Sequence, residues 1–190
     1  MIWRLSVTLF LVLDFLWVVF FVMRKKTNMV LIGMPGAGKS TVGVILAKMT
    51  SRDFVDTDVL IQLSAGRPLQ DIVDKDSHMA LRKIEEKVLL GLRCNNHVIA
   101  TGGSAVYSNA AMEYLKTNGT VVFLNVDLST LETRIHNFHT RGLAKRPDQS
   151  FNDLFEERLI LYQKYADIII DSGNLSQEEV CAEIIKRVEK

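Results

Sequence analysis

The sequence has little cysteine, little proline and almost no net charge. Two cysteines in 190 residues are too few for a disulfide framework, so Cys94 and Cys181 are expected to be reduced thiols. Lysine and arginine total 23 and aspartate and glutamate total 22, which leaves a net charge of +1. Proteins that bind nucleic acid mainly through its phosphates are clearly basic, so we expect no nucleic-acid partner. An apolar content of 48% excludes a disordered chain.

Long apolar runs are absent except at the start of the chain. Residues 1–23 are apolar at all but four positions, Arg4, Ser6, Thr8 and Asp14. The run over residues 5–23 is about as long as a helix needs to cross a bilayer core. The cations at 24–26 would keep the rest of the chain on the cytoplasmic side. Asp14 opposes insertion, because a carboxylate near the bilayer centre is costly.

Two interpretations of this segment stay open. Residues 1–26 form an apolar segment that contacts a membrane through residues 5–23, as an anchor for a cytoplasmic domain. Alternatively, the start of the chain is set too early, since Met23 and Met29 could each begin a chain that lacks the apolar run. In both cases residues 27–190 are expected to form one domain.

A phosphate-binding loop is the most informative feature of the sequence. Residues 33–40 match G-x-x-x-x-G-K-[ST] after an apolar stretch of strand type and before a helical pattern. Such a loop binds phosphate through backbone N–H groups and a helix N-terminus. We expect Lys39 to contact the outer phosphates and Ser40 to bind magnesium. The predicted nucleotide-binding residues here are Gly33, Gly36, Ala37, Gly38, Lys39, Ser40 and Thr41.

Polar residues follow the next two predicted strands. Asp56 and Asp58 stand at a strand end, where one carboxylate could face a metal and the other an acceptor. Capping of the next helix by Thr57 or Asp58 is the alternative. A later strand ends in two glycines at 102–103, which would let a ligand approach the backbone closely. Between them, a helix predicted over 77–93 carries Arg82 and Glu85, which are one turn apart and able to pair.

The order of these motifs resembles shikimate kinase, a family of the nucleoside-monophosphate-kinase-like group. The resemblance covers about residues 29–190. The family's second signature is fitted by Arg82, Glu85, Leu89 and the strand that ends in Gly102-Gly103. The sequence departs from the signature at Ser104, where the family has a third glycine.

Strands predicted near 29–33, 53–56, 97–101, 120–125 and 167–171 alternate with helices. This alternation predicts an α/β fold, a five-stranded parallel sheet with helices on both faces. The resemblance implies the strand order 2-3-1-4-5 of a three-layer P-loop NTPase. It also implies an acceptor-binding subdomain at about 57–94.

The resemblance implies roles for individual residues. ATP and Mg²⁺ would be the cofactors, with Asp56 helping to hold the metal through water. Asp58 would bind acceptor hydroxyls and take the proton of the attacking one. Arg82 and Arg158 would bind the acceptor carboxylate, which suits a planar guanidinium. Backbone N–H groups of the acceptor site would come from Gly102 and Gly103, and Arg134 would lie against adenine.

Residues 137–150 are polar, contain glycine and proline, and show no helical stripe, which predicts a mobile lid. A closing lid can deliver a cation to the transferred phosphoryl group. The family motif here is Arg-Pro-Leu, whereas this chain has Arg141-Gly-Leu and, five residues on, Arg146-Pro. We favour Arg141 as the catalytic cation, with Arg146 as the alternative.

The implied reaction is phosphoryl transfer from ATP to a hydroxyl of shikimate. The product, shikimate 3-phosphate, serves aromatic amino-acid (chorismate) biosynthesis. The departures from the family pattern cluster in the acceptor half, at Ser104, the lid, Leu81 and Ser77-His78. They leave open another small hydroxy acid, such as gluconate, as the acceptor.

A third hypothesis is a membrane-tethered nucleotide-binding regulator without turnover. We expect a monomer.

Overall fold

The structure, a computed structural model, describes residues 26–134 and 142–189. The proposed membrane anchor of residues 5–23 and the lid residue Arg141 lie outside the described residues. In the part of the chain that is described, no helix is both long enough and apolar enough to span a membrane.

Five parallel strands form one sheet in the order β2-β3-β1-β4-β5, which confirms the predicted fold and strand order. The central strand β1 is buried along its whole length, and Val30 lies opposite Ile99 on one side and Val121 on the other. Strands covered on both faces are built from continuous apolar runs, as here. The strands are β1 (Asn28–Ile32), β2 (Asp53–Asp56), β3 (His97–Ala100), β4 (Gly119–Asn125) and β5 (Ile168–Asp171).

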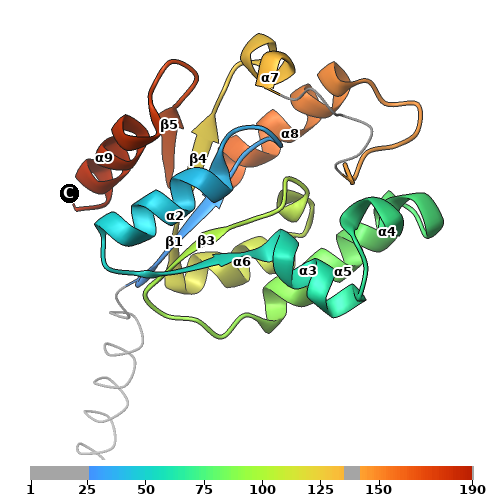
Figure 1. Cartoon of the computed structure of the whole chain (residues 1–190), viewed down its shortest axis with the longest axis horizontal. Coiled ribbons are helices and arrows are strands. Elements are labelled where there is room, and N and C mark those ends of the chain that lie inside the picture. The colour runs from blue at the N-terminus through green and yellow to red at the C-terminus, as the bar shows by residue number, and fades with distance from the viewer. Residues whose placement is uncertain (1–25, 135–141, 190) are drawn as a thin grey trace, which may run out of the picture.

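Helices cover both faces of this sheet and complete three layers. On one face α2 (Lys39–Met49) packs against α9 (Gln177–Val188), and on the other lie α6 (Asn109–Asn118) and α8 (Phe151–Tyr165) (Figure 1). Their apolar faces and the strands share one core. Ser150 and Ser176 begin α8 and α9 with capping boxes, which satisfy the first N–H groups of each helix.

A second group of helices projects beside the β2 edge of the sheet (Figure 1). It consists of α3 (Thr57–Ala65), α4 (Leu69–Lys75) and α5 (His78–Gly91). These helices have a small core of their own, formed by Ile61, Ile72, Leu81 and, from a distant part of the chain, Ala144. The short helices η1 (Ala105–Tyr107) and α7 (Leu128–Arg134) follow β3 and β4. All these connections leave the carboxyl ends of the strands, where ligands bind in open α/β sheets.

Candidate active site

The loop between β1 and α2 has the backbone of a phosphate-binding loop. Gly33, Gly36 and Gly38 have φ values of 146°, 84° and 90°, which residues other than glycine rarely adopt. A Cβ at Gly33 would also lie 2.8 Å from the carbonyl oxygen of Leu124. The loop ends at the first residue of α2, so the helix N-terminus faces the same space as the loop.

Lys39 lies at the centre of this loop with only 8% of its surface exposed. Its Nζ donates to the carbonyl oxygens of Gly33 (2.8 Å) and Met34 (3.0 Å). Burial lowers the pKa of Lys39 to about 8, although the carboxylate of Asp58 opposes that shift. The amine is therefore still mostly charged at pH 7.

Asp56 connects α2 to the start of α3. One carboxylate oxygen accepts from the Ser40 hydroxyl at 2.6 Å, and the other accepts from the backbone N–H of Asp58 at 2.9 Å. Asp56 is therefore the N-cap of α3, and capping by Thr57 or Asp58 is wrong. Thr57 is instead buried, and its hydroxyl oxygen accepts from the N–H of Gly102 at 3.1 Å.

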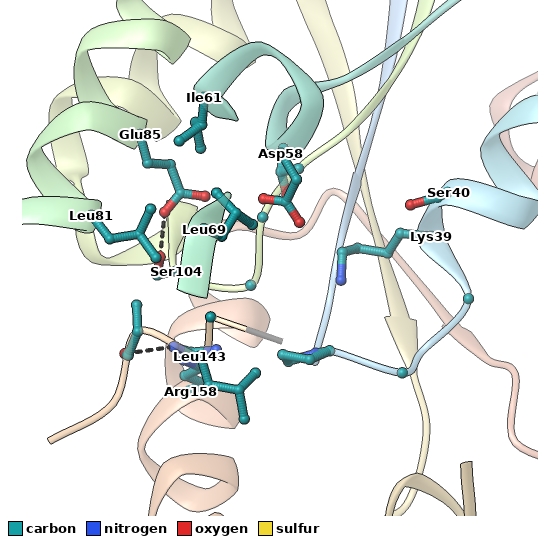
Figure 2. Close-up of a pocket in the computed structure, with 18 of the residues that line it drawn as sticks. Lys39, Ser40, Asp58, Ile61, Leu69, Leu81, Glu85, Ser104, Leu143 and Arg158 are labelled. Carbon is teal, nitrogen blue, oxygen red and sulfur yellow. Dashed lines mark hydrogen bonds between the residues drawn. The ribbon is translucent and has the colours of Figure 1, made fainter. Parts of the chain in front are cut away.

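Two carboxylates, Asp58 of α3 and Glu85 of α5, converge on Gly102. A Cβ at Gly102 would collide with Oε1 of Glu85 and lie 2.6 Å from Oδ1 of Asp58. Figure 2 shows both carboxylates extending into the same side of the pocket. Burial raises the pKa of Asp58, and burial together with Asp58 raises the pKa of Glu85 to about 7.

Glu85 is a site residue that the sequence interpretation missed. No ion pair joins it to Arg82. Instead it is 2% exposed, and its Oε2 accepts from the hydroxyl of Ser104. The position of Glu85 in the helical pattern could have revealed this. Glu85 lies midway between Leu81 and Leu89, and all three are the buried positions of α5. A carboxylate in an apolar helical stripe points inward.

Two guanidinium groups meet at the backbone oxygen of Ala144. Arg158 of α8, 1% exposed, donates to it at 3.0 Å, and Arg82 of α5 donates at 3.3 Å. The guanidinium of Arg82 also stacks 3.4 Å above the ring of Tyr107, whose hydroxyl donates to Glu157. The Nε atoms of both arginines have no hydrogen-bond partner among the described residues. This pair of cations is suited to bind a small anion bidentately.

One cavity of about 380 Å³ brings most of the predicted residues together. It is shown in Figure 2, with Lys39 and Ser40 on one side and Asp58, Glu85 and Arg158 around the other. The predicted residues that line it are Gly36, Gly38, Lys39, Ser40, Thr41, Asp58, Gly102, Gly103, Arg134 and Arg158. Four others are not in its lining, namely Gly33, Ala37, Asp56 and Arg82.

The described part of the predicted lid packs on the helical group. The N–H of Gly142 donates to Gln70 Oε1 at 2.6 Å, and Leu143 and Ala144 line the cavity. Arg146 is exposed, forms an ion pair with Glu157 at 3.2 Å and does not line the cavity. At the nucleotide end, Arg134 is exposed and donates to the carbonyl oxygen of Gly173 at 2.9 Å.

Comparison with known sequences identifies the family. The sequence model of the family described as shikimate kinase matches residues 35–189. The chain belongs to the shikimate kinase family. The shikimate kinase of Bacillus cytotoxicus is 38% identical over 157 residues, which is 82% of this chain and 94% of that relative. The shikimate kinase of Sulfurihydrogenibium is 34% identical over 164 residues, 86% of this chain and 98% of the relative.

Solved shikimate kinases have the same fold. The enzyme of Acinetobacter baumannii, determined in complex with shikimate, superposes with a TM-score of 0.80 at 29% identity and covers 88% of this chain and 96% of its own. The Aquifex aeolicus enzyme superposes with a TM-score of 0.73 at 35% identity, over 85% of this chain and 96% of its own. Shikimate kinases are small-molecule kinases that use ATP, and the loop before α2 is the expected place for its phosphates.

Proposed function

We propose that this chain transfers the γ-phosphoryl group of ATP to a hydroxyl of shikimate, forming shikimate 3-phosphate. The observation that carries the proposal is one cavity with a phosphate-binding loop at one end and Arg158 at the other, where Arg158 and Arg82 share the backbone oxygen of Ala144. Between them stand two carboxylates. A hydroxy acid that spans this space would have its carboxylate at the arginines and a hydroxyl towards the loop.

At the nucleotide end, the N-terminus of α2 and the loop glycines would bind the β- and γ-phosphates. The amine of Lys39 would leave the carbonyls of Gly33 and Met34 and contact the outer phosphates. Arg134, on the wall of the cavity, is proposed to lie against the adenine.

The oxygen ligands that Mg²⁺ prefers are present beside the loop. The Ser40 hydroxyl and the Asp56 carboxylate lie 2.6 Å apart, so one cation could contact both, directly or through water. Bound there, Mg²⁺ would neutralise charge on the phosphates. Because Asp56 also caps α3, the same carboxylate connects the proposed metal site to the backbone of Asp58.

At the acceptor end, Arg158 and Arg82 would bind the carboxylate of shikimate in the place now taken by the oxygen of Ala144. The N–H groups of Gly102 and Gly103 and the free oxygen of Glu85 would contact the hydroxyls. These contacts position the attacking hydroxyl, which is the main task of a phosphoryl-transfer site.

Asp58 is the proposed base. As the acceptor oxygen forms its bond to the γ-phosphorus and the bond to the β-phosphate oxygen breaks, the hydroxyl proton passes to Asp58. Burial raises the pKa of Asp58, so its carboxylate is a stronger base than an exposed aspartate. The lid cation, Arg141 in our proposal, would balance charge on the transferred group. Arg146 is less suited, because it pairs with Glu157.

A coupled assay of ADP release tests the proposal. The full chain is supplied with ATP, Mg²⁺ and one acceptor at a time, chosen from shikimate, gluconate and other small hydroxy acids. We expect turnover with shikimate and a much lower kcat/KM for the others. Turnover confined to another acceptor would replace shikimate, and ATP binding without any acceptor-dependent turnover would support a regulator instead.

Gly102→Ala should block the acceptor end of the cavity. The new methyl group would collide with Glu85 and press on Asp58, so the attacking hydroxyl is displaced. We expect kcat/KM for shikimate to fall by about 100-fold, the scale set by ångström misplacements, with ATP affinity unchanged. Gly91→Ala is the matched control, because a Cβ there meets nothing within 4 Å. Equal kcat/KM values for both variants would contradict this placement of the acceptor.

A further inference from the structure

Ser104 makes a contact that the family's glycine could not make. Its hydroxyl donates to Oε2 of Glu85, and both residues are buried. The other oxygen of Glu85, Oε1, has no partner among the described residues and lies against Gly102 in the acceptor half of the cavity. Figure 2 shows this hydrogen bond, and Ser104 lines the cavity together with Glu85.

We infer that Ser104 is a positioning residue that holds the carboxylate of Glu85 and directs its free oxygen to the acceptor's hydroxyls. This rests on the proposed function, because it assigns a hydroxylated acceptor to the cavity. A hydrogen bond to a carboxylate favours its charged form, and a charged oxygen accepts more strongly from a ligand hydroxyl.

The charges around Glu85 make its ionisation sensitive to this one hydrogen bond. Asp58 of α3 faces it and disfavours a second negative charge, whereas Lys39 of α2 and Arg158 of α8 favour it. Burial is the largest effect and raises the pKa of Glu85 to about 7, while the Ser104 hydroxyl opposes the rise. On its own helix, the guanidinium of Arg82 stacks on Tyr107 of η1. Loss of the Ser104 hydroxyl would therefore leave Glu85 mostly protonated at neutral pH.

The test measures the protons released when shikimate binds. Shikimate is titrated into the full chain by calorimetry at several pH values, in pairs of buffers with different ionisation enthalpies. If binding of shikimate favours ionised Glu85, the number of protons released per bound shikimate is greatest near the pKa of Glu85. In Ser104→Ala we expect this maximum to move up by about one pH unit. Shikimate should then bind about fivefold more weakly at pH 7 and equally well at pH 9.

Two other variants complete the design. Ser108→Ala is the matched control, because Ser108 donates to Glu86, one residue further along the same helix and outside the cavity. It also caps α6, so it should lower thermal stability without moving the proton release. Ser104→Gly should behave like Ser104→Ala, and the backbone at 104 (φ −97°, ψ −1°) suits both residues.

The outcomes are distinct. If the wild-type chain binds shikimate and Ser104→Ala shows the same pH of maximal release, Ser104 does not position Glu85 and the inference is overturned. The same holds if Ser104→Ala still shifts the release in a Glu85→Gln background. If the wild-type chain does not bind shikimate at all, the proposed function fails and this inference with it.

Discussion

Lys39→Met should lower kcat for shikimate phosphorylation by about 100- to 1,000-fold, the cost of removing one preorganised donor from a developing charge. Methionine keeps most of the apolar stem that fills this buried position, so the loop should keep its shape. The amine is lost, and with it the cation proposed to balance charge on the γ-phosphate. Single-turnover ADP formation at saturating ATP and shikimate measures the effect on chemistry directly.

Lys48→Met is the matched control for this variant. Lys48 lies in the last turn of the same helix α2, is exposed and is far along the helix from the loop. Its replacement should leave kcat within about twofold of wild type, since exposed substitutions away from special contacts change stability little. A Lys39→Met enzyme with near-normal turnover would remove Lys39 from the proposed mechanism.

The same lysine sets one side of the expected pH profile. Because the pKa of Lys39 in the free protein is about 8, its positive charge is present below that pH and lost above it. Bound phosphates favour the charged amine, so its pKa rises in the complex. We therefore expect kcat/KM for ATP to fall above about pH 8, while kcat at saturating ATP stays level to higher pH.

Asp58→Asn should lower kcat by about 100- to 10,000-fold, the usual contribution of a general base. Asparagine has nearly the same shape, and the backbone N–H of residue 58 still donates the capping hydrogen bond to Asp56, so the start of α3 is kept. What is lost is the ability to accept the proton of the attacking hydroxyl. Single-turnover kinetics with ATP and shikimate are again the measurement.

Stability should change in the opposite direction to activity. Burial raises the pKa of Asp58 in the folded protein, so its charged form is disfavoured there relative to the unfolded chain. At pH 7 the ionised carboxylate thus opposes folding, and Asp58→Asn should melt at the same temperature or higher. This advantage should disappear as the pH falls below the ordinary pKa of aspartate. Asp53→Asn, exposed at the other end of β2, is the control.

A variant that loses both activity and stability would point to a structural role for Asp58. A variant that keeps its activity would assign the proton to another acceptor, and Glu85 is the nearest alternative because it shares the contact with Gly102.

The sequence was sufficient for the fold because its signals are local. The buried run of β1, the loop before α2 and the regular alternation of strands and helices each occupy a few adjacent residues. The five strands and their order are as predicted. The strand order itself came from the family resemblance, since pairing between distant strands leaves no local pattern.

Within the site, the sequence was least informative where side chains from different elements meet. The helical spacing makes Glu85 able to pair with Arg82 on its own helix, but Glu85 accepts from Ser104, nineteen residues away. In the sequence, Ser104 is visible only as a departure from the family pattern. Arg82 turns to Tyr107 and Ala144 instead. Helical spacing shows which residues share one face of a helix. Which side chains of other elements contact that face depends on tertiary packing.

The carbonyl of Ala144 gives the acceptor a competitor within the chain itself. Both arginines already donate to this oxygen, and Ala144 belongs to the small core of the α3–α5 group. In the proposed binding mode a carboxylate would replace this oxygen, so part of its intrinsic binding free energy would go into moving Ala144. Measured acceptor affinity is then lower than the arginine contacts alone would give. If a bound nucleotide also favoured the arrangement with Ala144 moved away from the arginines, the acceptor would no longer lose that part of its binding free energy. The two substrates would then bind cooperatively without contact between them.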